Sequence, residues 1–316
     1  MARTRTTRLL TVVGLAGLVA VLTSGCSVNE VFAFGWPDGA TEQAQTMRAL
    51  WIGSVIAALI VGILVWGLIG WASVAYRKRG EAIPRQTQYN LPLEIVYTVI
   101  PFVIVAVLFY FTAVAQNEVQ AQTEDPDVRV GVTGFQWNWE FRYLGDQPNE
   151  FDSFDPLETE SGEPITTVGT STTVPILVVP TGRVVEYVLG STDVIHSFWV
   201  PEFLFKRDVF PSPSANNSDN TFQTTIDEPG AFVGRCAELC GVYHAFMNFE
   251  VRALPGDLFD RYFDIRQRTN PETDAPFTTG EALAELDCGE LCAPESTQTT
   301  PFDTGRGNRE ASTDRN

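Results

Sequence analysis

Two uncharged apolar runs occupy the first third of the chain. No charged residue occurs from Ala49 to Tyr76 or from Ile95 to Asn117, and each run exceeds the ~20 residues that a helix needs to cross the hydrocarbon core of a bilayer. The pattern predicts a transmembrane helical hairpin over residues 49–117. Lys and Arg are concentrated between the two runs, and positive charge marks the cytoplasmic side of a membrane. Both outer flanks are therefore expected on the extracytoplasmic side.

The N-terminus has the layout of a secretory signal. Three arginines accompany an apolar stretch from Leu9 to Leu22, which is too short for a normal span, and small residues precede Cys26. The sequence L-T-S-G-C resembles a bacterial lipoprotein box, with Thr23 in place of the usual aliphatic residue. We expect a lipoprotein-type signal peptide over residues 1–25 and an acylated Cys26 at the start of an extracytoplasmic segment, 26–48. A plain signal peptide with a free Cys26 is the alternative.

Beyond the second run the pattern changes to alternation and short apolar runs separated by turn residues. This pattern is typical of an all-β barrel or sandwich, predicted over residues 118–267. The predicted strands are Val128–Tyr143, Val174–Val179, Arg183–Leu189, Thr221–Ile226, Ala231–Cys236 and Phe249–Leu254. Residues 145–173, rich in Asp, Glu, Pro, Ser and Thr, are expected to form an acidic surface insertion. Helical spacing predicts an amphipathic helix over Pro255–Gln267, and the extension 268–316 is expected to be largely disordered.

The charge balance is strongly acidic. The chain has 21 Lys and Arg against 39 Asp and Glu, which gives a formal net charge of −18. A field of this sign attracts basic proteins and argues against nucleic acid as a partner. A cationic protein partner is favoured, and solubility alone is the alternative explanation.

The candidate chemistry lies in Cys236–Met247, which has the sequence C-A-E-L-C-G-V-Y-H-A-F-M. The chain has only one other histidine, His196. Thiolate, imidazole and thioether are the ligands of mononuclear cupredoxin copper sites. The second thiol of this loop allows the two sulfurs to bridge two coppers, each with one histidine and one weak axial ligand. We therefore predict a dinuclear copper site that transfers electrons.

Two other chemistries fit the same loop. In an oxidising compartment its two cysteines could form a disulfide. Zinc could take both thiolates with His196 and His244 in a closed tetrahedral site, which leaves Met247 without a role.

A second C-x3-C pair follows at Cys288 and Cys292, with no His or Met after it. Apart from Cys26, four cysteines allow three pairings. The local pairing predicts a Cys288–Cys292 disulfide and leaves Cys236 and Cys240 free for metal.

Two further features have both a functional and a structural interpretation. Glu94 lies at the inner end of the second apolar run, where an ionisable residue often marks an ion path; a carboxylate that suits the helix dipole is the alternative. Trp137 and Trp139 are expected on one face of the predicted strand Val128–Tyr143. Core packing is one explanation for them, and a surface tryptophan beside the metal site, serving for docking and electron uptake, is the other.

Together these motifs resemble subunit 2 of the haem-copper cytochrome c oxidases, from about Met47 to Gln267. The resemblance rests on D-V-I-H-S-F, the metal loop, Q-W-N-W and L-E-I-V-Y-T-V-I-P. It implies a cupredoxin-like domain whose dinuclear CuA centre takes electrons from cytochrome c and passes them to haem in subunit 1. The chain would then lie in the plasma membrane beside subunits 1 and 3 of a proton-pumping oxidase, with oxygen reduced to water in subunit 1.

The resemblance also implies the copper ligands. Cys236 and Cys240 would bridge the coppers, and His196 and His244 would bind one copper each. Met247 would be one of the two weak axial ligands.

Other roles follow from the same resemblance. The backbone carbonyl of Glu238 would be the second axial ligand, and its side chain would point to a magnesium or manganese ion at the subunit 1 interface. Trp137 matches the tryptophan through which electrons enter. Glu94 matches the glutamate near the mouth of a proton path.

The chain departs from the family pattern at three places. Asn138 replaces a commonly aromatic residue, the loop 145–173 is longer, and the tail with its second cysteine pair is additional. With the lipoprotein-like start and the Arg-rich, Lys-poor usage, these features indicate an actinobacterial enzyme. Its expected donor is cytochrome c or a membrane-bound cytochrome c within a supercomplex. The alternatives are a CuA-bearing subunit of a nitric oxide reductase and a non-redox, membrane-anchored scaffold domain.

Overall fold

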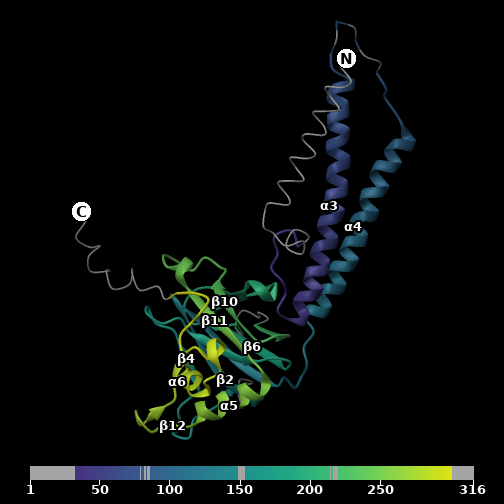
Figure 1. The fold of residues 1–316 in the computed structure, drawn as a ribbon. Coiled ribbons are helices and arrows are strands. Elements are labelled where there is room, and N and C mark those ends of the chain that lie inside the picture. Colours follow the sequence, from purple (N-terminus) through teal and green to yellow (C-terminus); the bar gives the residue numbers. More distant parts are fainter. Residues whose placement is uncertain are drawn as a thin grey trace, which may run out of the picture.

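The computed structural model describes residues 33–78, 80–81, 83, 86–148, 154–213, 215 and 220–300. A pair of long helices extends from one end of a β domain, and two further helices lie at the opposite end of that domain (Figure 1). The expected signal peptide, residues 1–25, and Cys26 lie outside the described residues.

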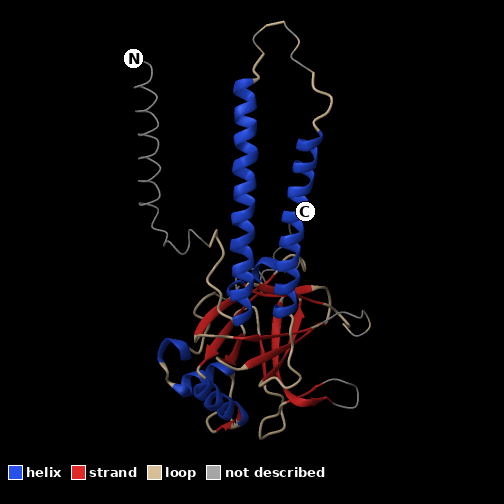
Figure 2. Ribbon diagram, turned by 90° about the vertical axis from the view of Figure 1, so that its right-hand side faces the viewer, coloured by secondary structure: helices blue, strands red, loops and turns tan. Residues whose placement is uncertain are grey.

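The two long helices are α3 (Glu42–Ala75) and α4 (Leu91–Val119). Both are long and apolar enough to cross a membrane, and they run side by side in opposite directions (Figure 2). Thr41 caps α3 by accepting from the N–H of Ala44 at 3.1 Å, which satisfies one of the free donors of the first turn. The predicted hairpin is confirmed. α3 begins seven residues before its uncharged run, and α4 extends beyond its run at both ends.

Two sheets pack face to face to form a sandwich. The first has the order β3-β2-β1-β6-β9, with β4 on β2. Its strands are β1 (Val128–Phe135), β2 (Asn138–Pro148), β3 (Phe154–Pro156), β4 (Thr166–Val168), β6 (Val184–Ser191) and β9 (Thr221–Thr225). The second has the order β5-β11-β10-β7-β8. Its strands are β5 (Ile176–Pro180), β7 (His196–Val200), β8 (Phe205–Val209), β10 (Gly230–Cys236) and β11 (Asn248–Leu254). The predicted all-β architecture is confirmed.

Aromatic side chains from both sheets fill the core. Trp139, Tyr187, Phe198 and Phe249 are almost fully buried, and the ring centroids of Phe198 and Phe249 are 4.7 Å apart in a stacked arrangement. Each large aromatic side chain removes 150–250 Å² or so from water. This burial holds the two sheets together.

One predicted strand, Val128–Tyr143, is a hairpin. β1 and β2 pair in antiparallel fashion, with Phe135 opposite Asn138, so Trp137 lies in the turn while Trp139 is buried in the core. The prediction that both tryptophans share one face is therefore wrong. The turn has no Gly or Pro to signal it, so the apolar pattern continues through it.

The insertion and the extension contain more structure than expected. Part of β2, together with β3 and β4, lies within residues 145–173, and Ile165 between the last two is fully buried. The extension contains β12 (Thr269–Asn270), β13 (Ala275–Pro276), α6 (Thr279–Leu286) and the 3-10 helix η3 (Gly289–Cys292). The expectation of a largely disordered extension is wrong for residues 269–300, because α6 buries Ala282, Leu283 and Leu286. Residues 301–316 lie outside the described range.

α5 (Gly256–Gln267) follows β11 directly, where the sequence predicts a helix. Its buried side chains include Phe259, Tyr262 and Arg266. α6 begins with a capping box between Thr278 and Glu281, which satisfies two donors at its first turn. Helices α5 and α6 thus close the end of the sandwich away from the membrane helices (Figure 1).

Candidate metal centre

Adjacent strands of the second sheet bring the soft ligands together. His196 is the first residue of β7, Cys236 is the last residue of β10, and Met247 directly precedes β11. β10 pairs with both β7 and β11, and the N–H of Cys236 donates to the carbonyl of Met247 at 3.1 Å. The sheet therefore fixes the two ends of the loop on which His244 lies.

The sulfur and nitrogen atoms form a continuous cluster. The sulfurs of Cys236 and Cys240 are 3.7 Å apart, and both thiols are free. Nδ1 of His196 lies 3.8 Å from the Cys236 sulfur, and Nδ1 of His244 lies 3.6 Å from the Cys240 sulfur. Sδ of Met247 is 3.8 Å from the Cys240 sulfur. Each thiol thus has its own imidazole.

The donor set fits a soft metal. The carbonyl oxygen of Glu238 lies 3.2 Å from the Cys236 sulfur, on a residue whose side chain is exposed. Thiolates, imidazoles and a thioether together match copper, whereas a closed four-ligand zinc site makes no use of Met247. Ligand atoms of His196, Cys236 and Cys240 all lie within 4.8 Å of one another, on buried residues.

The two thiols differ in acidity. Burial raises the pKa of Cys236, but hydrogen bonds with His196 and with the backbone outweigh it, so the pKa falls from 9.0 to about 7. Burial, and next the charge of Cys236, raise the pKa of Cys240 to about 12. Burial lowers the pKa of His196, and hydrogen bonds with Cys236 and Asp193 raise it above 6.5. Cys236 therefore loses its proton first.

Asp193 orients the first imidazole, a role that the sequence reasoning missed. Its Oδ1 lies 2.8 Å from Nε2 of His196 and accepts from the N–H of Val194 at 2.7 Å, while Oδ2 accepts from the N–H of Gln136 at 2.7 Å. A carboxylate on the outer nitrogen of a ligand histidine fixes the ring orientation. The D-x-x-H spacing was visible in D-V-I-H-S-F, but that spacing alone is too common to assign a role.

Trp137 reaches the metal loop from the β1–β2 turn. Its Nε1 donates to the carbonyl of Cys240 at 3.2 Å, and Nε2 of Gln136 donates to the same oxygen at 2.7 Å. The ring of Trp137 also packs against Tyr243, with centroids 5.0 Å apart. Gly241 has φ +126°, and a Cβ there would meet Trp137 at 3.0 Å. The close approach of this turn therefore requires glycine.

Glu94 lies apart from this cluster, in the first turn of α4. Its carboxylate accepts from the N–H of Asn90 at 3.0 Å, which is the local role of a helix-start carboxylate. α4 has 29 residues and therefore spans about 44 Å at 1.5 Å per residue. The domain lies at the other end of that helix.

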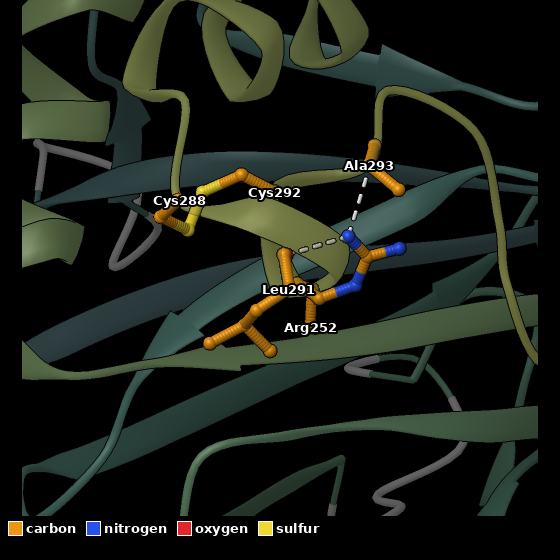
Figure 3. The surroundings of a disulfide bond; sticks show 5 residues. All are labelled: Arg252, Cys288, Leu291, Cys292 and Ala293. Atoms are coloured by element: carbon orange, nitrogen blue, oxygen red, sulfur yellow. Dashed lines mark hydrogen bonds between the residues drawn. A yellow bond between two sulfur atoms is a disulfide. The ribbon is translucent and has the colours of Figure 1, made fainter.

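The second cysteine pair has a different environment. Cys288 and Cys292 are joined by a disulfide at η3, and Nη1 of Arg252 donates to the carbonyls of Leu291 at 2.7 Å and Ala293 at 3.1 Å (Figure 3). Arg252 thus binds the backbone next to this disulfide, while Cys292 is buried in the hydrophobic core.

Comparisons with known proteins agree with this architecture. The family model described as "Cytochrome C oxidase subunit II, periplasmic domain" matches residues 128–254, and that of the transmembrane domain of the same subunit matches residues 29–113. The Nocardia farcinica protein named "Probable cytochrome c oxidase subunit 2" is 49% identical, over 96% of this chain and 91% of its own length. Cytochrome c oxidase subunit 2 of Mycobacterium tuberculosis is 44% identical, over 95% and 90%.

Among solved structures, the periplasmic domain of subunit II of cytochrome oxidase from Bradyrhizobium japonicum is similar. It is 26% identical and covers 44% of this chain and 92% of its own, with a TM-score of 0.31. The curated relatives that are 40–49% identical are actinobacterial, and the resemblance inferred from the motifs is confirmed. Because such relatives cover nearly its whole length, the chain belongs to the cytochrome c oxidase subunit 2 family, a component of the haem-copper oxidases.

Proposed function

We propose that this chain carries a dinuclear CuA centre and is the subunit through which electrons enter a terminal oxidase. Electrons would come from a cytochrome c and pass to haem in subunit 1, where oxygen is reduced to water with proton pumping. One observation carries the proposal: Cys236 and Cys240 present adjacent free sulfurs, and each sulfur faces its own histidine Nδ1. This arrangement is what two metals sharing two thiolates require.

Each side chain of the cluster has a defined task. Cys236 and Cys240 would bridge the metals, and His196 and His244 would bind one each. Met247 would be one weak axial ligand. When bound, the copper pair supplies a one-electron carrier. The sheet holds the ligands in place before the metal binds, and this preorganisation keeps structural change on redox cycling small.

Partner proteins would meet the loop on its exposed surface. Leu239 and Val242 are 77% and 82% exposed, and apolar side chains of this kind suit contact with subunits 1 and 3. The Glu238 carbonyl would be the second axial ligand, and its exposed carboxylate suits a magnesium or manganese ion shared with subunit 1. Trp137, packed on the Cys240 carbonyl, is our candidate for electron uptake.

The membrane part supports the remaining roles. Two membrane helices precede a soluble domain, and the positive connection between them supports an extracytoplasmic domain at the plasma membrane. Glu94 would then lie near the cytoplasmic mouth of a proton path into subunit 1, and an acylated Cys26 would add a second anchor. The acidic charge suits a basic cytochrome c, soluble or membrane-bound within a supercomplex.

Copper analysis of the full-length chain in detergent tests the proposal. We expect two coppers per chain and an electron paramagnetic resonance spectrum of one unpaired electron shared by both nuclei. A single-copper spectrum, or zinc without a redox signal, would rule out the dinuclear site.

The assembled complex tests the reaction. Oxygen consumption driven by reduced cytochrome c supports an oxidase, and reduction of nitric oxide alone would favour the reductase alternative. Glu94→Gln should slow turnover and proton uptake, and unchanged rates would remove its role in a proton path.

A further inference from the structure

A groove of about 570 Å³ lies between the two membrane helices, near the helix ends that join the β domain (Figure 2). Its walls are mainly apolar and include Ala49, Leu50 and Gly53 on α3, and Phe111, Val114 and Ala115 on α4. A Cβ added to Gly53 would meet no described atom within 4 Å, and Phe111 and Val114 are exposed. The groove is therefore open sideways, toward the bilayer that the helices would span.

The groove is about as long as one leaflet of a bilayer is thick. Its lining on α4 runs from Val107 to Glu118, a rise of about 16 Å at 1.5 Å per residue. Half of a hydrocarbon core of about 30 Å measures about 15 Å. At the polar end, Thr46 Oγ1 donates to Glu118 Oε1 at 2.8 Å. Both residues flank the uncharged runs, so this end lies at the membrane surface and the groove fits one hydrocarbon chain of that leaflet.

The N-terminal segment is held on α3 beside this groove. The carbonyl of Ala33 accepts from Nε1 of Trp51 at 3.0 Å, and the rings of Trp36 and Trp51 stack with centroids 4.8 Å apart. Trp51 directly follows Leu50, which lines the groove. Tryptophan is enriched where helices cross the surface of a membrane. Ala33, the first described residue, is thus anchored near the polar end of the groove.

The distance from Ala33 to the groove is within reach of the preceding residues. Cys26 lies outside the described residues and precedes Ala33 by seven positions, and a chain of that length spans at most about 25 Å. A helix with its side chains is only about 10–12 Å wide. A lipid attached to Cys26 can therefore enter the groove from either side of α3.

We propose that the groove between α3 and α4 binds one acyl chain of the lipid on Cys26, which presupposes the acylation proposed above. The charge at the polar end favours this occupant over a free phospholipid. Glu118 is exposed there, and its carboxylate repels the phosphate of a phospholipid head group. The acyl chains of a lipoprotein cysteine are joined through uncharged ester and amide groups. Binding would tie the N-terminus to both membrane helices.

Photo-crosslinking in the assembled complex, purified from membranes, tests the proposal. A diazirine-bearing amino acid in place of Gly53 should form an adduct with the acylated N-terminal peptide, which mass spectrometry identifies after digestion. Ile56 is 47% exposed on α3 and outside the groove lining, and the same replacement there should give no such adduct. Adducts of the Gly53 position with phospholipid or with a partner subunit alone would overturn the proposal.

The mass of the N-terminal peptide separates this proposal from the acylation on which it depends. A mature N-terminus without an acyl chain would refute the acylation and the groove ligand together. An acylated peptide that forms no adduct with the Gly53 position would refute the groove ligand alone, and the lipid anchor would stand.

Filling the groove should displace the acyl chain. With the diazirine at Val114, which lines the groove and is 45% exposed, Gly53→Leu should lower the yield of the N-terminal adduct about tenfold, because an overpacked site excludes its ligand. Gly62→Leu adds the same side chain in open space on α3, outside the lining, and should leave the yield unchanged. Leucine favours a helix more than glycine does, so both variants should fold. Equal yields from the two variants would overturn the proposal.

Discussion

The two C-x3-C pairs of this chain have the same spacing and different chemistry. Cys236 and Cys240 are free thiols 3.7 Å apart, whereas Cys288 and Cys292 form a disulfide. Both histidines of the chain lie at the first pair, and backbone carbonyls with the Arg252 guanidinium lie at the second (Figure 3). The difference teaches that the surroundings of a cysteine pair, more than its spacing, decide whether it can hold a metal.

Each pair is also tied to a different part of the fold. The first closes a loop between strands β10 and β11 at the edge of the core. The second lies in the extension, which is held on β11 by the buried ion pair of Glu250 and Arg252. Glu250 Oε2 accepts from the N–H groups of Thr297 and Gln298 at 2.8 Å each. Arg252 donates to backbone carbonyls of the same segment. We propose a metal-binding task for the first pair, whereas the second lies in a segment that is fastened to β11.

Removal of one metal ligand gives the largest expected effect. Cys240→Ser takes away one of the two sulfurs that we propose to bridge the coppers, and we expect complete loss of the two-copper spectrum. The double variant Cys288→Ser/Cys292→Ser is the matched control and should retain two coppers. Copper analysis with electron paramagnetic resonance gives the result, and copper loss in the control would break the distinction between the pairs.

Arg252→Met tests how firmly the second pair is fastened. The change leaves Glu250 buried without its partner and removes donors to three carbonyls of the extension, so we expect a loss of about 3–5 kcal/mol in the free energy of unfolding. Arg261 is exposed on α5, and Arg261→Met should change stability by less than about 0.5 kcal/mol. Chemical denaturation of the full chain measures both, and similar values for the two variants would contradict the role of the buried pair.

Loss of the second disulfide should have a smaller effect. The bond closes a short loop, since the two cysteines are four residues apart, and a loop of this length stabilises by about 2 kcal/mol through the unfolded state. We expect the Cys288→Ser/Cys292→Ser variant to lose this amount. A thermal midpoint equal to that of the parent would show that the hydrogen bonds of Arg252 suffice.

The smallest expected effect is the change in copper affinity per pH unit. Copper binds thiolates, so protons must leave as it binds. Cys240, with its pKa raised to about 12, keeps its proton throughout the neutral range, and Cys236, with a pKa of about 7, gains one as the pH falls below that value. Affinity should therefore fall as pH falls, about tenfold per pH unit for each proton displaced, and more steeply below pH 7. Competition titrations at several pH values measure the slope, and an affinity independent of pH would contradict the assignment of the thiols as ligands.

Local patterns predicted much of this protein. The two spans follow from uncharged runs that must satisfy their own backbone in lipid. The strand-rich domain follows from alternation, and the metal loop follows from ligand types crowded into twelve residues. Such features depend on neighbours in the sequence, so no long-range contact is needed to recognise them.

Other features required the folded chain. The turn that places Trp137 on the Cys240 carbonyl joins residues about a hundred positions apart. The contact between Asp193 and His196 depends on the orientation of the imidazole ring, which the sequence does not give. α6 was missed because it has only eight residues, too few for a helical period to stand out, and its apolar side chains are buried only once the chain has folded.

The sequence by itself therefore determined the membrane hairpin, the β domain and the types of ligand, since hydrophobic periodicity and side-chain chemistry are local properties. Only the tertiary structure decided which cysteines face imidazoles, how Trp137 meets the metal loop, and how the insertion and the extension fold onto the β domain. These outcomes depend on the register and packing of segments that are distant in the sequence. Such segments come into contact only when the whole core forms.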